Sequence, residues 1–412
     1  MPSLYVFQGV PSCMVMTTSA LLYNDMGADI KSFTFWTSLV CLPWSFKPLW
    51  APLVERYSTK LEWVRRTQIL LVLAFVLLGL SMVTPVFYPV SLAMMLVVAF
   101  ASSCHDIACD GYYMMALDER GQSFFVGIRS TFYRVAMVAT TGLVPLIAGS
   151  VAESQGTAVG WATALCCAGA LLAVMAILCR WGMPRIAEQT GRQDNSLSIF
   201  VRALKSFFTH PGMAAAVTYF CTYRLGEAIL SKMILPFLNS DRDVGGLGIG
   251  VGECGLIYGT FGVLALVVGG ILGGIFVSRV GLRRAMWPMT ILMNVPNLAY
   301  VALAYWQPAS DSLWVPAAVM TEQFGYGFGF TAYMLMMIHY VGEAEYKAAE
   351  YAIGSSIMSL SLILPGMASG WVYEVLFGTS YLNVFLAACV LTLPGIVAAG
   401  ALWRNLGTER AA

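Results

Sequence analysis

Charged residues are scarce in this chain of 412 residues, because Asp, Glu, Lys and Arg make up 11% of it while hydrophobic residues make up 58%. A soluble domain of this length carries about twice that share of charge on its surface. The net charge is only +1, so no strong field attracts nucleic acid. The composition therefore excludes a soluble globular protein and indicates an integral membrane protein.

Motifs for metal binding or covalent catalysis are also lacking. The ten cysteines include no Cys-x-x-Cys pair, and the three histidines His105, His210 and His339 are far apart, so no metal site or disulfide framework is expected. Neither His-Glu-x-x-His nor Gly-x-Ser-x-Gly occurs, which argues against a membrane enzyme. The absence of an Asn-x-Ser/Thr sequon favours a bacterial inner membrane over a glycosylated cell surface.

Long apolar runs separated by short polar turns predict an all-α integral membrane protein with twelve transmembrane helices, since one span needs about 20 mostly apolar residues. The predicted spans are 3–23, 32–54, 67–85, 90–115, 122–150, 160–181, 211–238, 248–277, 285–305, 313–340, 349–376 and 381–403. The longest polar stretch, 182–210, divides them into two pseudo-symmetric six-helix bundles, 1–181 and 211–412.

The stretch 182–210 is predicted to be a cytoplasmic linker that contains an amphipathic helix. From Ser196 to Phe207, one helical face carries the apolar residues Ile199, Phe200, Ala203, Leu204 and Phe207. Such a face predicts a helix lying at the membrane surface, and a flexible linker is the alternative.

Lys and Arg are distributed unevenly between the two sides of the predicted membrane protein. With the N-terminus in the cytoplasm, 16 of the 23 Lys and Arg lie in cytoplasmic loops, and only Lys31 and Arg242 lie on the other side. Cytoplasmic loops of membrane proteins carry such an excess. We therefore expect a multi-pass protein of the inner membrane with both termini in the cytoplasm.

The remaining cations and five acids fall within the predicted spans, where each costs about 2.5–3.5 kcal/mol or more if it faces lipid. They are Lys47, Arg129, Arg134, Arg224, Lys232, Asp106, Asp110, Glu227, Glu322 and Glu374. We expect them to face the bundle interior, a charged partner or water, and charges of this kind are typical of secondary transporters. Glu374 is expected near the outer surface, in an interface. A channel is disfavoured because the charges are spread over different spans.

The fourth and fifth spans form a predicted hairpin. Residues equally distant from its turn lie at equal depth because each helix rises about 1.5 Å per residue, which pairs Asp110 with Arg129 and Asp106 with Arg134. Asp106 and Asp110 are four residues apart and share a face. This predicted ladder either couples transport to protons or only holds the hairpin together. Lys47 is expected to reach Asp110 or to extend to the lipid headgroups.

The second half carries its charges in the seventh and tenth spans. Arg224 and Glu227 are three residues apart and could pair within one helix. Glu322 has no cation within a turn in its own span, and Gln323 lies beside it. A carboxyl group in an apolar cavity can hold a proton at physiological pH. The candidates for proton coupling are Glu322, which ranks first, Asp106, Asp110 and Glu227.

A short motif occurs in both halves. After the eighth span comes Ser278-Arg279-Val-Gly281-Leu-Arg283-Arg284, and its first-half counterpart ends in Glu55-Arg56. These stretches resemble the loop motif that follows the second and eighth spans in the major facilitator superfamily, although Glu55 replaces an Asp and Ser278 supplies no charge. The resemblance implies the major facilitator fold and a latch that holds one access state. Its residues would be Lys47, Glu55, Arg56, Arg279, Arg283 and Arg284.

Further stretches resemble the AmpG-like muropeptide permeases of that superfamily and the related acetyl-CoA transporter family. They are Gln8-Gly9-Val10-Pro11, Lys47-Pro-Leu-Trp50, His105-Asp106-Ile107-Ala-Cys-Asp110, Tyr133-Arg134, Tyr223-Arg224-Leu225-Gly226-Glu227 and Glu322-Gln323-Phe324. The resemblance implies proton-driven import of N-acetylglucosamine linked to anhydro-N-acetylmuramic acid, with or without a peptide. Acetyl-CoA, a siderophore or another small anionic solute is the alternative.

An anionic sugar or sugar-peptide needs cations and aromatic rings around it. The candidate substrate-binding residues are Arg129, Tyr133, Arg134, Tyr223, Arg224, Lys232 and Gln323. We expect a monomer in the lipid bilayer that uses the proton gradient as its energy source, without a cofactor, a metal or nucleic acid.

Overall fold

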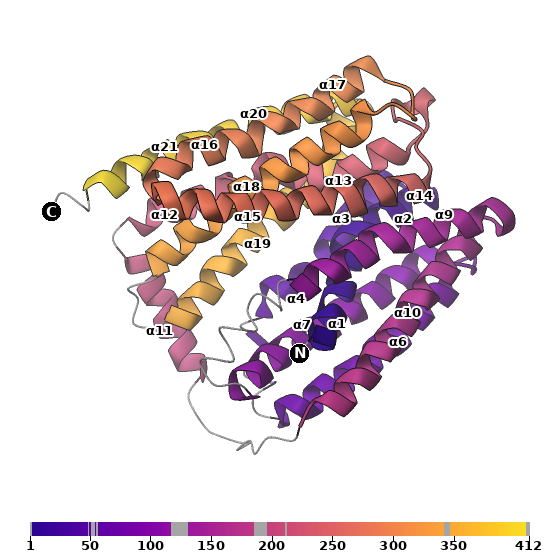
Figure 1. Cartoon of the computed structure of the whole chain (residues 1–412), viewed down its shortest axis with the longest axis horizontal. Helices are drawn as coiled ribbons and strands as arrows, with labels where there is room; N and C mark the ends of the chain where they lie inside the picture. Colours follow the sequence, from indigo (N-terminus) through magenta and orange to yellow (C-terminus); the bar gives the residue numbers. More distant parts are fainter. Residues whose placement is uncertain are drawn as a thin grey trace. The chain divides into compact units, whose positions relative to one another are not determined.

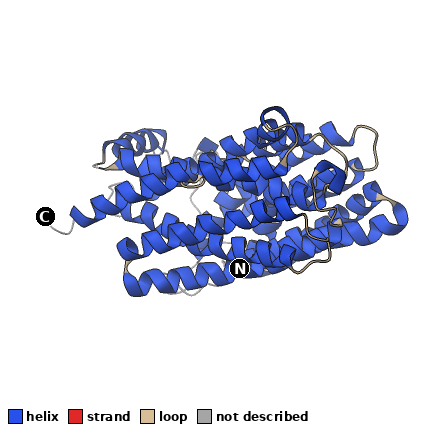
Figure 2. Ribbon diagram, turned by 90° about the horizontal axis from the view of Figure 1, so that it is seen from above, coloured by secondary structure: helices blue, strands red, loops and turns tan. Residues whose placement is uncertain are grey.

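The computed structural model describes residues 2–47, 49–50, 54, 57–116, 131–184, 196–210, 212–341 and 347–408. Within these ranges the chain folds into helices joined by short loops and contains no strand (Figure 2). The predicted all-α class is therefore confirmed.

The chain forms two compact units. The first unit contains Met1–Ala28, Leu39–Asn195 and Gly250–Thr260. Its helices are α1 (Pro2–Cys13), the π-helix η1 (Met14–Thr18), α2 (Ser19–Asp25), α4 (Leu42–Ser45), α6 (Lys60–Ser81), α7 (Phe87–Ala116), the π-helix η2 (Ala139–Leu143), α9 (Val144–Gln155), α10 (Thr157–Gly182) and α14 (Val251–Cys254). Residues 131–138 are helical as well. Figure 1 shows α6, α7, α9 and α10 as long helices.

The second unit contains Asp29–Ser38, Ser196–Ile249 and Phe261–Ala412. Its helices are α3 (Ile30–Leu39), α11 (Ser196–Thr209), α12 (Met213–Thr222), α13 (Leu225–Asn239), η3 (Arg242–Val244), α15 (Val263–Val280), α16 (Leu282–Asn294), η5 (Val295–Asn297), α17 (Leu298–Trp306), α18 (Trp314–Val341), α19 (Lys347–Trp371), the π-helix η6 (Val372–Leu376), α20 (Tyr381–Leu391) and α21 (Leu393–Thr408). The π-helix η4 (Gly255–Gly262) crosses from the first unit to the second. Each unit thus takes a segment from the other half of the sequence, and the predicted division at 182–210 stays a prediction.

Seven helices in the described ranges are long and apolar enough to cross a membrane. They are Lys60–Ser81, Phe87–Ala116, Thr131–Gln155, Thr157–Gly182, Val251–Val280, Glu350–Leu376 and Tyr381–Trp403. The other five predicted spans coincide with α1–α2, α3–α4, α12–α13, α16–α17 and α18. The first continues through the π-helix η1 and the fourth through the 3-10 helix η5, whereas α3–α4 and α12–α13 are broken. The fifth predicted span ends too early at residue 150, because α9 continues to Gln155 and stops where Gly156 adopts a φ of 88°.

Two spans that the sequence predicts as continuous are broken. The second is interrupted between Leu39, where α3 ends, and Leu42, where α4 begins with Pro43 in its first turn. The seventh is interrupted at Arg224, whose φ of −110° lies outside the helical range. Both breaks lie beside ionisable residues, and they change which side chains can meet.

Glycines bring α15 and α18 into close contact. A Cβ added at Gly269 in α15 would collide with the carbonyl oxygen of Phe324, and one added at Gly327 in α18 would collide with that of Leu266. Gly325, in α18, faces α16 in the same way, at the carbonyl oxygen of Leu292. Glycines at these positions therefore permit the close packing of these helices.

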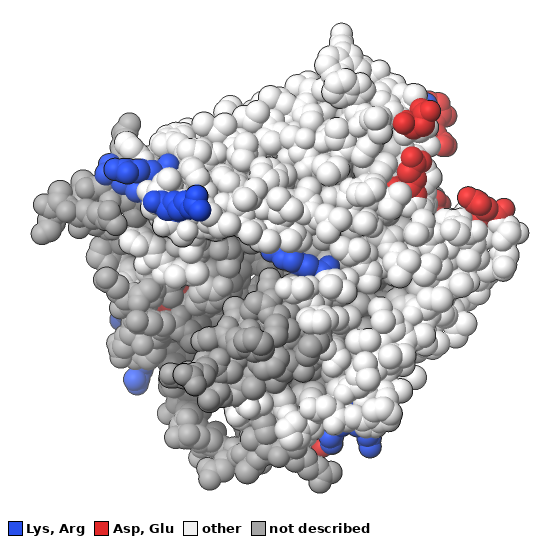
Figure 3. Space-filling view, viewed as in Figure 1, with Lys and Arg blue, Asp and Glu red and all other residues white. Residues whose placement is uncertain are grey.

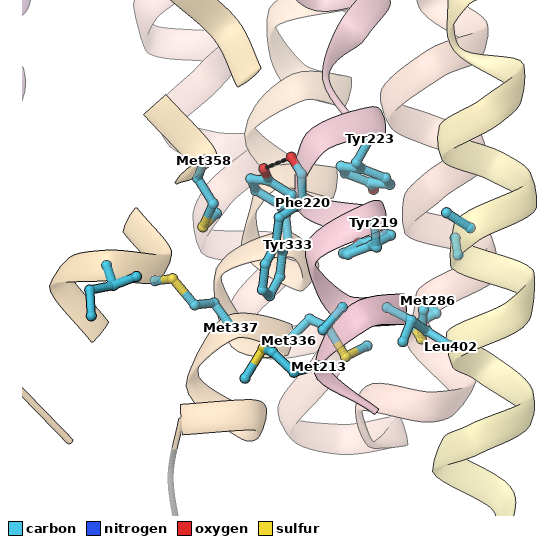
Figure 4. Packing of buried hydrophobic residues seen from close by; sticks show 14 of the residues in the cluster. Met213, Tyr219, Phe220, Tyr223, Met286, Tyr333, Met336, Met337, Met358 and Leu402 are labelled. Carbon is cyan, nitrogen blue, oxygen red and sulfur yellow. Dashed lines mark hydrogen bonds between the residues drawn. The ribbon is translucent and has the colours of Figure 1, made fainter. Parts of the chain in front are cut away.

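The amphipathic helix α11 packs against the second unit instead of lying only at the membrane surface. Ala203 and Phe207 are fully buried in a cluster of aromatic and methionine side chains around Tyr333 (Figure 4), whereas Leu204 is 37% exposed. Residues four apart share a helical face, so Ala203 and Phe207 define the buried face and Leu204 lies beside it. The side chains of the predicted face residues Ile199 and Phe200 lie outside the described part.

Exposed charges of the second unit gather at the two ends of its helices (Figure 3). Arg279, Arg283 and Arg284 are exposed around the turn from α15 to α16. Asp241, Asp243 and Asp311 are exposed in the loops at the opposite helix ends. The surface between these ends is almost free of charge in Figure 3, as a bilayer-spanning helix bundle requires.

Candidate functional site

The predicted site residues fall into one group in each unit, and the two groups are described separately. Three of them, Glu55, Arg56 and Arg129, lie outside the described residues, so the Asp110–Arg129 rung of the predicted ladder lies there as well. No cluster of His, Cys, Asp and Glu that could hold a metal ion occurs in the described ranges.

In the first unit, an ion pair joins Lys47 to Asp106. The Lys47 Nζ lies 2.5 Å from the Asp106 Oδ2, and the side chains are 33% and 7% exposed respectively. Lys47 follows the short helix α4, and Asp106 lies within α7. A charged hydrogen bond of this kind is about twice as strong as a neutral one.

Neighbouring polar contacts fix α4 on α7 next to this ion pair. The Trp50 Nε1 donates to the Ser103 Oγ at 3.2 Å and to the Pro43 carbonyl oxygen at 3.1 Å. The Ser103 Oγ in turn donates to the same carbonyl at 2.9 Å. Because Ser103 and Asp106 are three residues apart on α7, they present one face to the α4 segment. This face sets the position of the Lys47 ammonium group.

Two predicted pairings in the first unit are wrong. Lys47 forms its ion pair with Asp106 instead of Asp110, and its alternative contact with the lipid headgroups stays a prediction. Among the described residues, no ion pair joins Asp106 to the half-buried Arg134. Equal depth in a predicted hairpin does not fix the rotation of each helix about its axis, so the Arg134 side chain points elsewhere. Asp110 is half-buried, one turn after Asp106 on α7.

Tyr133 and His105 complete the first group. The Tyr133 hydroxyl lies 3.1 Å from the Ser12 Oγ of α1, and either atom can be the donor. His105 is fully buried against the ring of Phe7, with a centroid distance of 4.9 Å, and lies 3.4 Å from the Cys109 Sγ. These contacts are those of a histidine packed in the core of the first unit.

In the second unit, Glu322 is the most deeply buried of the predicted acids. It is 0% exposed, and its Oε2 accepts hydrogen bonds from the Tyr300 hydroxyl at 3.1 Å and from the Gln323 Nε2 at 3.0 Å. Its Oε1 has no hydrogen-bond partner among the described residues. Glu322 therefore sits in a dry site with neutral donors, where burying a charge is costly unless a proton neutralises it.

Arg224 faces two rings of α18. Its Nη2 donates to the Tyr326 hydroxyl at 2.5 Å, and its guanidinium carbon lies 5.4 Å from the Tyr326 ring centroid and 5.1 Å from that of Phe330. Glu322, Tyr326 and Phe330 are spaced four residues apart, so they form one line along α18. The buried acid and the rings that hold Arg224 therefore share a helical face.

The predicted intrahelical pair of Arg224 and Glu227 is wrong. No ion pair within the described residues joins them, because Arg224 lies in the break before α13 and its side chain is held by Tyr326. Glu227 is 8% exposed and still interacts electrostatically with both Arg224 and Glu322. Two carboxyl groups and one guanidinium group are thus concentrated in the interior of the second unit.

Lys232 and Tyr223 occupy different surroundings. The Lys232 Nζ donates to the Thr37 Oγ1 of α3 at 3.3 Å, and Lys232 is 7% exposed. Tyr223 is 1% exposed and stacks on Tyr333 at 5.2 Å between centroids, within the cluster drawn in Figure 4. The Tyr333 hydroxyl donates to the Phe220 carbonyl oxygen at 2.6 Å. Tyr223 therefore packs in a core, and its contact with a substrate stays a prediction.

The described latch residues of the second half lie at the turn between α15 and α16, where Gly281 adopts a φ of 80°. The Arg283 guanidinium carbon lies 4.8 Å from the ring centroid of Trp403 in α21. Arg279 and Arg284 are exposed. Arg283 thus ties the α15–α16 turn to the last helix of the same unit, and the latch as a whole remains a prediction.

Three residues of these groups were not singled out from the sequence. The sequence contains a signal that could have identified Tyr326, because this residue lies four positions after Glu322 in the same span and so shares its helical face. The sequence contains no such signal for Tyr300, since its contact with Glu322 depends on how α17 packs beside α18. Lys60 was expected in a cytoplasmic loop but is 8% exposed, with its aliphatic stem against Gly111.

The chain resembles carriers in sequence and in structure. The sequence pattern of the family described as the Major Facilitator Superfamily matches residues 4–349. The chain is 27% identical over 397 residues to the "Anhydromuropeptide permease" of Escherichia coli (strain K12), covering 94% of this chain and 76% of that protein. It is 25% identical over 410 residues to the "Putative transporter AmpG 4" of Rickettsia conorii, covering 95% and 92%. The predicted resemblance to AmpG-like permeases is therefore confirmed.

Solved structures share the fold at lower identity. A D-xylose-proton symporter matches with a TM-score of 0.74 and 9% identity, covering 98% of this chain and 95% of that one. The nucleoside transporter NupG matches with a TM-score of 0.67 and 16% identity, covering 96% and 98%. These likenesses show a major facilitator fold, as the sequence predicts.

Proposed function

The chain belongs to the Major Facilitator Superfamily, and from this membership we propose that it is a proton-coupled importer of anhydromuropeptides. It is a multi-pass membrane carrier of a small-molecule solute and not an enzyme. The finer parts of the proposal are the solute, the proton as the driving ion and the direction of transport. Each of these has its own support and its own test.

Sequence similarity supports the solute. The anhydromuropeptide permease of Escherichia coli aligns along 94% of this chain, including the segments around Asp106, Arg224 and Glu322. The expected solute is N-acetylglucosamine linked to anhydro-N-acetylmuramic acid, with or without a peptide, which carries acidic groups and sugar faces. Arg224 beside Tyr326 and Phe330 offers the charge and the aromatic rings that such a molecule needs. The other proposed contacts are Arg129, Tyr133, Arg134, Tyr223, Lys232 and Gln323.

The burial of Glu322 is the observation that carries proton coupling. Glu322 is fully buried and contacts only neutral donors among the described residues, with Glu227 as a nearby acid. Such a carboxyl group binds a proton readily, and its charge state then changes its interaction with Glu227, which itself interacts with Arg224. Glu322 is proposed as the first proton carrier, and Glu227, Asp106 and Asp110 as further candidates. Asp106 already has a counter-ion in Lys47, so its proton affinity depends on that contact.

The remaining features of the proposal concern topology. The cations at the α15–α16 turn favour the cytoplasm for that end of the second unit, and hence for both termini. The proposal further includes location in the inner membrane, a monomeric state and two six-helix halves joined at 182–210. It also includes a latch formed by Lys47, Glu55, Arg56, Arg279, Arg283 and Arg284. No cofactor is required, because the proton gradient supplies the energy.

Uptake into proteoliposomes tests the proposal. Labelled anhydromuropeptide and labelled acetyl-CoA are offered in parallel, with and without an imposed proton gradient. We expect accumulation of the anhydromuropeptide only with the gradient, and loss of accumulation when a protonophore is added. Accumulation of acetyl-CoA instead would show that the proposed solute is wrong. Solute entry that is unaffected by the gradient would show that transport is not coupled to protons. Folded protein that moves neither solute contradicts the assignment.

A further inference from the structure

The first part of α3, from Ile30 to Ser38, packs against α19 within the second unit. A Cβ added at Gly370 in α19 would lie 2.5 Å from the Lys31 Cα, and one added at Gly366 would lie 3.3 Å from the Ser38 Oγ. Thr34 and Ser38 are fully buried. Because Gly366 and Gly370 are four residues apart, they form a groove along one face of α19 that receives the α3 backbone.

Glu374 continues this face by one further turn and reaches the N-terminus of α3. Its Oε1 accepts a hydrogen bond from the Lys31 backbone N–H at 3.0 Å. The Asp29 Oδ2 accepts from the Ser32 backbone N–H at 2.8 Å. The N-terminus of α3 is therefore capped twice, once by its own preceding residue and once by a carboxylate from η6, 343 residues away in the sequence.

The two caps differ in what they stabilise. Asp29 belongs to the same segment as α3 and caps the Ser32 N–H from within it, and its carboxyl group also interacts with that of Glu374. Glu374 satisfies the Lys31 N–H only while α3 lies against α19, because a free helix end leaves that group to water. The carboxylate also meets the positive end of the helix dipole, which adds to the attraction. Glu374 therefore favours one position of α3 over any other.

The C-terminal end of the same segment is held by a second contact and then by a break in the chain. The Lys232 Nζ donates to the Thr37 Oγ1 at 3.3 Å. After Leu39 the helix stops, and the division between the two compact units falls between Ser38 and Leu39. The segment Asp29–Ser38 is thus a short helix that can change its contacts with α19 without unwinding a longer one.

We propose that Asp29–Ser38 is a gate segment of the carrier and that Glu374 latches it by capping its N-terminus from α19. Glu374 is a positioning residue, since it acts on the segment and touches no solute. The proposal rests on the proposed function to the extent that a gate serves a carrier with alternating access. Lys232 contacts Thr37 of the gate segment and is also one of the residues proposed to bind an anionic solute. Binding of the solute to Lys232 therefore competes with its contact to Thr37.

Cysteine accessibility tests the latch without any solute. Thr34→Cys places a thiol on the buried face of the gate segment, and a water-soluble maleimide reports in detergent solution how often that face opens. The parent chain, with its ten native cysteines, gives the background rate. We expect Glu374→Ala to raise the labelling rate of Cys at 34 roughly fivefold, which corresponds to about 1 kcal/mol for one helix cap. Glu374→Gln keeps an acceptor oxygen and is expected to give a smaller increase.

Asp311→Ala is the matched control, because Asp311 is an exposed acid in a loop of the same unit. It is expected to leave the labelling rate unchanged. Should Glu374→Ala fail to fold, Glu374→Asp keeps the charge but shortens the reach, and it is expected to open the segment as well. Labelling at the parent rate in a folded Glu374→Ala or Glu374→Asp protein overturns the latch. The result is independent of whether any solute is transported, so the latch and the proposed function can fail separately.

Discussion

Two buried candidate acids for proton coupling, one from each unit, are held in opposite ways. In the first unit, Asp106 faces the ammonium group of Lys47 at 2.5 Å. In the second unit, Glu322 is fully buried, and within the described ranges its hydrogen bonds come from the neutral groups of Tyr300 and Gln323. A carboxylate with a counter-ion stays ionised, whereas a carboxyl group in a dry site with neutral donors is easily protonated.

This difference favours Glu322 over Asp106 as the proposed proton carrier. Glu322 has only neutral donors among the described residues, whereas Asp106 has Lys47 as its counter-ion. The following predictions test whether the two acids differ in this way.

The largest effect is expected from Glu322→Gln, which removes the proton-binding group and keeps the shape of the side chain. We expect proton-driven accumulation of solute to be abolished, while exchange of solute across the membrane without a gradient continues. Counterflow and gradient-driven uptake in the same proteoliposomes measure both activities. Glu153→Gln, at an exposed position of α9, is the control and is expected to behave as the parent. Normal accumulation by Glu322→Gln would remove Glu322 from coupling.

The next effect concerns the ion pair of the first unit. Asp106→Asn leaves the Lys47 ammonium group without its carboxylate, which costs about 1–3 kcal/mol after allowance for the one-third exposure of Lys47. We expect a melting temperature lower by several degrees and the loss of coupled uptake. The double variant Lys47→Met with Asp106→Asn restores the melting temperature by removing both charges. If the pair is only structural, the double variant also recovers uptake, whereas continued loss of uptake assigns the pair to transport.

The fold was predictable because hydrophobicity alone marks a helix that crosses a bilayer. Four spans were placed within a few residues of their observed bounds, namely α7, α10, α19 with η6, and α20 with α21 as far as Trp403. The breaks after Leu39 and at Arg224 were not predicted, because apolar residues continue through both. A hydropathy pattern reports burial in lipid and is insensitive to the backbone dihedral angles that interrupt a helix.

The site was predictable in its members and less so in its pairings. Glu322 was ranked first because its span offers it no cation, and it lies in a dry pocket of neutral donors. The partners of Lys47 and Arg224 were missed, since each lies beside a helix break that turns its side chain away from the residue spaced for it. Spacing predicts neighbours within a continuous helix, whereas contacts between helices depend on the rotation of each one about its axis.

A smaller effect is expected from Arg224→Lys in the second unit. Lysine keeps the positive charge but loses the planar group that bonds the Tyr326 hydroxyl and lies 5.1 Å from the Phe330 ring centroid. The lost contacts are worth about 1–1.5 kcal/mol, or roughly a tenfold weaker apparent affinity for an anionic solute. The concentration dependence of uptake measures this apparent affinity, and Arg202→Lys at an exposed position of α11 is the control. Unchanged affinity in Arg224→Lys would mean that the guanidinium group only packs against α18.

The smallest effect is expected from Tyr300→Phe, which removes one of the two donors to Glu322 and leaves the ring in place. The lost hydrogen bond is worth about 0.5–1.5 kcal/mol. Without this donor the Glu322 carboxyl group loses one of its two hydrogen bonds, so we expect the pH of half-maximal uptake to shift. Tyr373→Phe, at a tyrosine of η6 in the same unit, controls for the loss of a buried hydroxyl. A pH profile that shifts equally in both variants would place the coupling proton elsewhere than on Glu322.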